Sequence, residues 1–239
     1  MGPIGLAVLP LLFLLFGALA VGLLVYFSIE QAKKRRAAML SWAAGRGWAL
    51  VADASYLAGR WRGAPFGSGR ARRVTNAATG MFAGRPGITF DYHYTTGSGK
   101  NRTTHHYHVT VLSMPAALPH LQLTPENFGT TIAKVFGGED IEFESEQLNQ
   151  MWRVQSSVRR FAYDVVHPRL MERLLYPDAR GPMRFEGTDL VSWRSGLQDP
   201  RWIDARLALL NDVIGSVPDF VWRQVGHDPH RTAPGAGPA

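Results

Sequence analysis

Residues 4–27 read IGLAVLPLLFLLFGALAVGLLVYF, and four basic residues, Lys33 to Arg36, follow shortly after this apolar run. At about 1.5 Å per helical residue the run is about 36 Å long, so it can cross a hydrocarbon core of about 30 Å with some tilt. It is too long for the apolar core of a secretory signal peptide, and neither a basic leader nor a small-residue cleavage site flanks it. We therefore predict a transmembrane anchor over residues 1–30.

The basic residues after the run predict its orientation. Loops on the cytoplasmic side of a membrane carry the excess of Lys and Arg. We expect a single-pass protein of the cell membrane, with a short N-terminus outside and everything from about residue 30 onward in the cytoplasm. The absence of cysteine agrees with a reducing compartment.

Positive charge is concentrated next to the anchor. Residues 31–73 hold ten basic residues and one acidic residue, whereas residues 74–239 sum to −1 of a total of +7. Juxtamembrane basic residues attract anionic lipid headgroups by about 1 kcal/mol per charge. The charges from Arg60 to Arg73 therefore indicate a lipid-responsive segment. We favour lipid over nucleic acid because the anchor holds this segment within a Debye length of the bilayer.

Two stretches alternate between apolar and polar residues, as strands with one buried face do. They are residues 88–94 (ITFDYHY) and 105–111 (HHYHVTV), and the Gly-containing residues 95–104 between them predict a long hairpin loop. The other predicted elements are short strands at 48–51, 121–123, 141–143 and 152–154, a hairpin over 184–193 with its turn at 187–188, and helices beginning at Pro125, Ser145, Val158, Pro168 and Pro200.

This order of elements, without a βαβ alternation, predicts an α+β fold with one mostly antiparallel sheet and packed helices. After the anchor we expect a basic juxtamembrane helix and loop over residues 31–73, the helix ending near Gly45 and Gly47. The α+β cytosolic domain is then expected over 74–225, followed by a disordered tail over 226–239 that is rich in Pro, Gly and Ala.

Candidate chemistry centres on one polar strand face. If Tyr94 pairs with His105, then His93 faces His106 and Asp91 faces His108, with Cβ atoms of each pair about 4.5–5.5 Å apart. Three imidazoles and a carboxylate on one face can bind zinc or a similar ion. A solvated polar face is the simpler interpretation, so we assign no metal site and expect no cofactor.

Sequence motifs for catalysis are missing. Residues 97–100 (GSGK) lack both the upstream glycine and the Ser or Thr after Lys100 that a phosphate-binding loop needs. The chain has no nucleophile elbow, HExxH or dinucleotide fingerprint, and a cysteine nucleophile is excluded. We assign no catalytic residue, and an enzyme is the less favoured interpretation.

Residues 141–175 resemble an uncharacterised family of bacterial membrane-anchored proteins that is classed as a domain of unknown function. The likeness is carried by residues 143–146 (FESE), 152–154 (WRV), 161–163 (FAY) and 167–174 (HPRLMERL), and by the order of anchor and domain. The resemblance implies one shared strand-rich α+β domain and no particular activity.

We hypothesise a single-pass membrane protein that presents a cytosolic interaction or scaffolding domain to a protein partner. Two alternatives stay open. One is a metal-dependent enzyme or sensor that uses Asp91, His93, His106 and His108. The other is a module that responds to anionic lipid.

Overall fold

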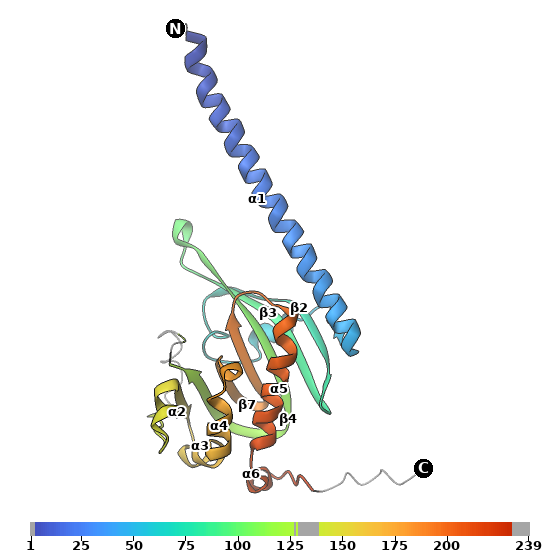
Figure 1. Ribbon diagram of the computed structural model, residues 1–239, viewed down its shortest axis with the longest axis vertical. Helices are drawn as coiled ribbons and strands as arrows, with labels where there is room; N and C mark the ends of the chain where they lie inside the picture. Colours follow the sequence, from blue (N-terminus) through green and yellow to red (C-terminus); the bar gives the residue numbers. More distant parts are fainter. Residues whose placement is uncertain (1–2, 127, 129–138, 231–239) are drawn as a thin grey trace, which may run out of the picture.

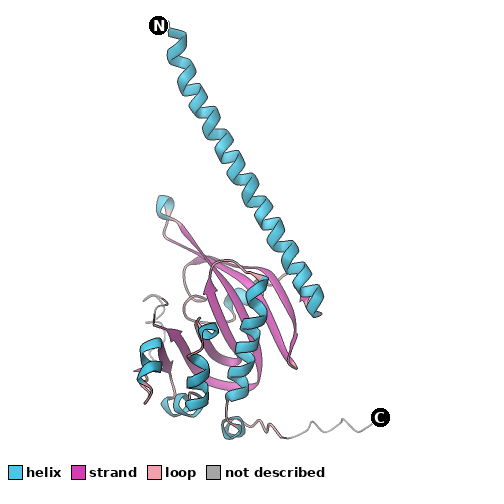
Figure 2. Cartoon of the chain, in the orientation of Figure 1, coloured by secondary structure: helices cyan, strands magenta, loops and turns pink. Residues whose placement is uncertain are grey.

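The computed structural model describes residues 3–126, 128 and 139–230. A long helix leads into an antiparallel sheet that shorter helices cover (Figures 1 and 2). The helices are α1 (Pro3–Arg46), α2 (Glu146–Met151), α3 (Arg159–Val165), α4 (Pro168–Leu174), α5 (Pro200–Ser216) and α6 (Asp219–Gln224). The strands are β1 (Ala49–Leu50), β2 (Arg70–Phe82), β3 (Arg85–Thr96), β4 (Thr103–Pro125), β5 (Glu139–Asp140), β6 (Trp152–Ser156) and β7 (Met183–Ser195). The predicted α+β class is confirmed.

Helix α1 projects away from the domain over most of its length (Figure 1). Its large apolar side chains from Phe13 to Ile29 are exposed. Among the described residues, α1 is the one helix long and apolar enough to cross a membrane. It ends at Arg46, as predicted, because Gly47 adopts φ +66° and turns the chain into β1.

The sheet is built around β4. The first half of β4 pairs with β3 and its second half with β6, whereas β7 pairs with both halves along the other edge. β2 and β1 extend the sheet beyond β3, and β5 extends it beyond β6. All of these pairs are antiparallel, as predicted.

The predicted hairpin over residues 184–193 is wrong. Its two arms form one strand, β7, and both arms pair with β4 instead of with each other. The ladder shifts register around Gly187, where φ is +61° and where Leu118 is the partner. The ends of β7 come back together, since the Trp193 N–H donates to the Pro182 carbonyl at 3.3 Å. The turn residues therefore mark a sharp bend in a long two-stranded ribbon.

Strand β2 was not predicted, and its first residues lie in the segment expected to be an irregular basic loop. Two features hide the alternation that a strand normally shows. Ala71 and Asn76 adopt φ of 50° and 52°, and the pairing with β3 shifts register near both residues. Small and basic side chains also replace the usual β-branched and aromatic ones.

The helix expected to begin at Pro125 is also wrong at its start. Thr124 and Pro125 end β4, where they pair with Arg153 and Trp152 of β6. Most of the remaining residues of that predicted helix lie outside the described ones. A strand was expected at 141–143, and the structure has it at Glu139–Asp140 as β5. Ile141 and Phe143, which follow β5, are buried in the core.

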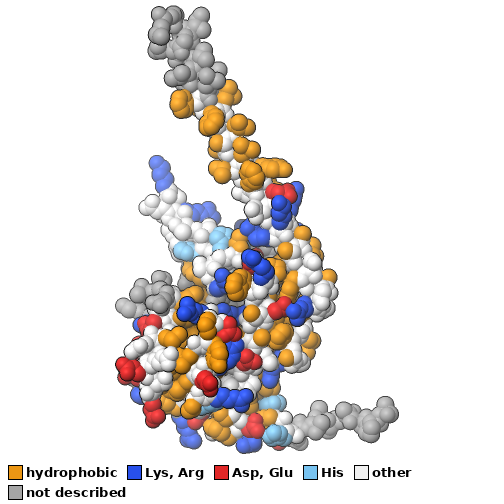
Figure 3. All heavy atoms as spheres, in the orientation of Figure 1, with side chains coloured by type: hydrophobic (Ala, Val, Ile, Leu, Met, Phe, Trp, Pro, Cys, Tyr) orange, Lys and Arg blue, Asp and Glu red, His pale blue; other side chains and the backbone are white. Residues whose placement is uncertain are grey.

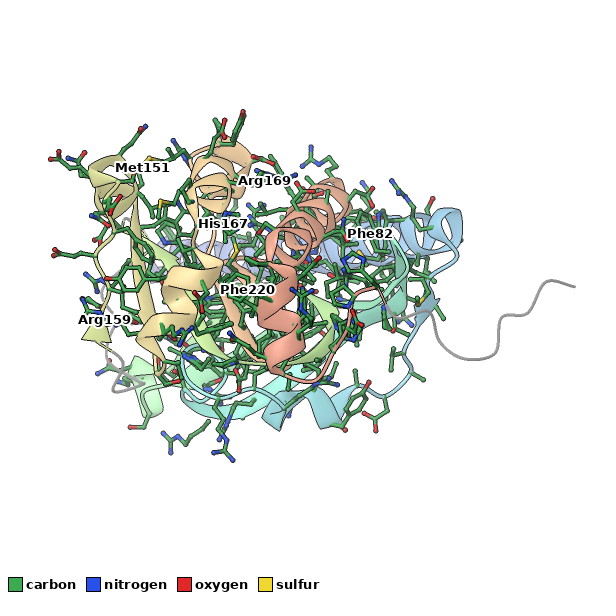
Figure 4. All side chains as sticks on the ribbon, turned by 90° about the horizontal axis from the view of Figure 1, so that it is seen from below. Phe82, Met151, Arg159, His167, Arg169 and Phe220 are labelled. Atoms are coloured by element: carbon green, nitrogen blue, oxygen red, sulfur yellow. The ribbon has the colours of Figure 1, made fainter. Side chains whose placement is uncertain are left out.

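The sheet has a packed layer on each face. Helices α2 to α5 lie along one side (Figure 4), and their buried residues form the larger core with Met39 and Ala43 of α1. The segment between β1 and β2 covers the opposite face with Trp61 and Phe66, which pack on the aromatic residues of β3. The domain is therefore a sheet between two apolar layers.

Candidate functional site

The strands β3 and β4 pair in the register that was assumed for the polar cluster. Tyr94 lies opposite His105, His93 opposite His106 and Asp91 opposite His108. All four residues of the predicted polar cluster therefore share one face of the sheet, and this face is the one that α5 covers. Asp91 and His108 are buried, whereas His93 is half-buried and His106 is exposed, so only part of the predicted polar face is covered.

Asp91 is held in a buried network. Its carboxylate accepts hydrogen bonds from the Asn76 amide at 2.9 Å and from the backbone N–H of Gln198 at 2.6 Å. Burial raises the pKa of Asp91, and the two hydrogen bonds oppose this rise. The carboxylate thus fixes the loop that connects β7 to α5.

His108 occupies the centre of the same network. Its Nε2 lies 2.8 Å from the Thr89 hydroxyl, and that hydroxyl also accepts from the Gln198 side-chain amide at 2.9 Å. Burial lowers the pKa of His108 to about 3, helped by the nearby positive charges of Arg194 and Arg206. The imidazole is therefore neutral across the physiological pH range.

The other two histidines stand nearer the solvent. The rings of His93 and His106 are 5.3 Å apart, and burial together with His106 lowers the pKa of His93. The polar cluster is divided, because Asp91 and His108 bind other groups. Across the described residues, no three His, Asp or Glu side chains converge on a point where a metal ion fits. The structure thus gives the metal-site hypothesis no support.

A cavity of about 730 Å³ opens beside His108. Its floor is the polar sheet face, with His108 and Thr110 from β4 and Ser192 from β7. One wall is the first part of α5, which begins at Pro200 because Asp199 caps it by accepting from the Arg201 N–H. The facing wall comes from the end of α2 and from residues 177–181. We call this cavity the groove.

Sequence reasoning missed the groove because its residues come from distant parts of the chain. Trp202 and Arg206 were placed on the final helix by their spacing, and Met151, labelled in Figure 4, on the short helix α2. Only the bend of the β4–β7 ribbon brings these elements together. The one available signal for the groove was Arg206, an arginine on the same turns of a predicted amphipathic helix as Ile203 and Leu207.

Comparisons with known proteins give a fold neighbour and no family. No family model matches the chain, and no curated protein matches it in sequence. The chain is similar to the crystal structure of the mycobacterial trehalose monomycolate transport factor A, TtfA. The TM-score is 0.56 over 77% of this chain and 96% of that one, at 15% sequence identity. At this identity the likeness is one of fold alone.

Proposed function

We propose that this chain is a single-pass membrane protein whose α+β domain works as an interaction module at the cytoplasmic surface of the membrane. The observation that carries the proposal is the continuity of α1, which runs without a break from its exposed apolar part into the core of the domain. A domain attached in this way cannot drift from the bilayer as one on a flexible linker does.

The attachment of α1 involves both packing and charge. Met39 and Ala43 are each 2% exposed in the larger core. The side chain of Asp204 on α5 accepts hydrogen bonds from Trp42 at 3.3 Å and from Arg46 at 2.6 Å. The helix end is thereby fixed both to the sheet and to α5.

The basic residues after the apolar run support an orientation with the N-terminus outside. The fold neighbour is named as a trehalose monomycolate transport factor. By analogy we propose that this domain is an accessory factor in transport at the membrane, acting through a protein partner in the same bilayer.

Chemical crosslinking in the producing cell tests this proposal. The full chain is purified from crosslinked membranes beside a control chimera in which residues 1–38 carry an unrelated soluble domain. We expect membrane proteins to be enriched with the full chain and not with the chimera. If the two samples contain the same proteins, the domain has no partner of its own and the interaction role is wrong.

A second role, contact with anionic lipid, is favoured by the β3–β4 hairpin. This hairpin projects towards the same side as the N-terminal part of α1 (Figure 1). Basic side chains at its tip lie at about the height where charged side chains end the apolar part of α1 (Figure 3). Lys100 and Arg102 are exposed there, and Arg70 of β2 donates to the Gly97 carbonyl at 2.8 Å. We call residues 97–102 the basic finger.

In the lipid-contact proposal, the basic finger takes over part of the role that the sequence indicated for the segment from Arg60 to Arg73. Arg60 is engaged inside the domain, where its Nε lies 2.8 Å from the buried carboxylate of Asp189. Its charge is thus already balanced, whereas Lys100 and Arg102 face outward at the tip. We therefore propose the finger and Lys33 to Arg36 as two contacts with headgroups.

Fluorescence at the tip tests the lipid contact, because the chain has no natural cysteine to compete for a label. We expect an environment-sensitive dye on Asn101→Cys, in full-length protein in nanodiscs, to shift to the blue when anionic phosphatidylglycerol is added to phosphatidylcholine. Salt at about 1 M should reverse the shift, since the Debye length is then about 3 Å.

The control dye sits on Glu172→Cys of α4, where no shift is expected. Lys100→Gln with Arg102→Gln should abolish the response, and equal emission in neutral and anionic nanodiscs would disprove the contact. The same Asn101→Cys protein reports orientation. In intact cells an impermeant maleimide should label it only after permeabilisation, and labelling without permeabilisation would reverse the proposed topology.

A further inference from the structure

The groove is lined by both cationic and apolar side chains. Arg206 of α5, Arg180 before β7 and Arg194 of β7 line it, and the guanidinium of Arg194 lies 5.3 Å from the ring centre of Trp202. Pro125, Phe128, Met151 and Trp152 line another part of it and lie together, because Pro125 pairs with Trp152 and its carbonyl accepts from the Phe128 N–H.

Arg206 is the central cation. Its Nη2 donates to the Arg180 carbonyl at 2.6 Å, and Gly181 packs so closely that an added Cβ would lie 2.8 Å from the same nitrogen. Its other terminal nitrogen, Nη1, is buried and has no hydrogen-bond partner among the described residues. Burial lowers the pKa of Arg206 to about 10, with a contribution from Arg194, so the side chain is still charged at neutral pH. A partly buried guanidinium whose charge is not balanced by an ion pair favours an anionic partner.

The nearby carboxylates are paired with other cations, although the charge of Asp178 still raises the pKa of Arg206. Asp178 lines the groove but forms an ion pair with Arg173 at 2.8 Å, and Asp199 pairs with Arg201 at 2.6 Å. Within the described part of the chain, Arg180, Arg194 and Arg206 form no ion pair. Three guanidinium groups thus surround one cavity with a surplus of positive charge.

We propose that the groove binds an anionic amphiphile, a molecule with an acidic head group and an apolar chain. The head group lies against the accessible part of Arg206, within reach of Arg180 and Arg194. The chain lies along Met151, Trp152 and Phe128. A free inorganic anion would leave this apolar surface uncovered, and a neutral lipid would leave the buried charge unpaired. The volume of about 730 Å³ falls within the range of small-molecule sites. This site goes beyond the proposed interaction role, because it takes a ligand and not a protein partner.

Photocrosslinking to full-length protein in phosphatidylcholine nanodiscs tests the site. The probe is a long-chain fatty acid with a diazirine in its chain, compared with the fatty alcohol of the same length. We expect the acid, and not the alcohol, to label peptides from 150–152, 177–181 and 202–206. Both probes should label α1, which serves as an internal reference for partitioning into the bilayer.

Arg206→Gln removes the charge together with the hydrogen bond to the Arg180 carbonyl, and Arg194→Gln removes an exposed charge with little risk to folding. Each variant should lower groove labelling relative to α1 labelling by about tenfold, as expected when a hydrogen bond to a charged group is lost. The matched control is Arg223→Gln on α6, which should label like the natural chain.

Equal groove labelling by the acid and the alcohol, or unchanged labelling in both groove variants, would overturn the proposal. So would inorganic phosphate that competes as well as unlabelled fatty acid does, because the site would then be one for a free anion. Loss of α1 labelling by both probes would count against the membrane anchor alone. The groove site and the anchor are therefore tested by different outcomes.

Discussion

Replacing Trp48 by alanine is expected to lower the free energy of unfolding by about 3–5 kcal/mol, the usual cost of removing a buried tryptophan. Trp48 is 6% exposed and joins the end of α1 to the β2–β3 hairpin. Its ring lies 5.1 Å from that of Trp42, and its Nε1 donates to the Met81 carbonyl at 3.3 Å. Chemical denaturation of the full chain, followed by far-ultraviolet circular dichroism, measures the loss.

Two glycines make this site specific for the indole ring. An added Cβ at Gly80 would lie 2.5 Å from the ring of Trp48, and one at Gly87 would lie 2.9 Å from it. Gly80→Ala alone should therefore cost about 1–3 kcal/mol through overpacking. In the Trp48→Ala background the same substitution should cost much less, because the clashing ring is gone. Equal costs in both backgrounds would contradict the packing account. As a control, Trp202→Ala removes a ring that is 53% exposed and should cost no more than about 1 kcal/mol.

Stability is expected to fall as the pH drops from about 6.5 towards 4, by about 1.4 kcal/mol per pH unit for each buried neutral histidine. The pKa is lowered to about 3 for His108 and to about 4 for His120, in both cases mainly by burial. Below pH 6.5 the unfolded chain therefore binds protons that the folded chain does not. Asp91 acts in the opposite sense, since its raised pKa lets the folded state take up a proton before the unfolded state does.

Urea unfolding at several pH values between 7 and 4.5 checks this expectation. His108→Gln should give a shallower dependence by about one proton, and adding His120→Gln should remove about one more. The two residues face different surroundings, His108 beside Arg194 and Arg206 and His120 beside Arg184, so their effects should add. Identical slopes for the natural chain and the double variant would show that neither histidine is held neutral by the fold.

The parts of the fold that the sequence predicted correctly are those set by short-range patterns. The apolar run, the alternation in β3 and β4, and the starts of α2 and α5 each depend on residues within or next to one element. The alternation set the face of each strand but not the register of the histidine pairs, since a slip of two residues keeps the face and changes the partners.

The parts that could not be predicted depend on long-range geometry. Gly187 predicts a turn, but whether the strands on either side pair with each other or with β4 is decided by a partner about 70 residues away in the chain. The polar cluster has the composition of a metal site, yet Asn76 and Gln198, which occupy its carboxylate, come from distant segments. Likewise Arg206 has no functional signature until the bent ribbon places Arg180 and Arg194 beside it.

Because α1 is unbroken, the direction in which the domain faces depends on the rotation that accumulates along the helix. Each residue of an α-helix advances the chain by about 100° around its axis, so the number of residues between the apolar run and Met39 sets which side of α1 the basic finger and the groove occupy. One residue added or removed near Arg36 would swing the whole domain about a quarter of a turn around the helix while leaving its fold intact. For a partner that contacts both the span and the domain, the number of residues in this connection would therefore set the angle at which the domain is presented.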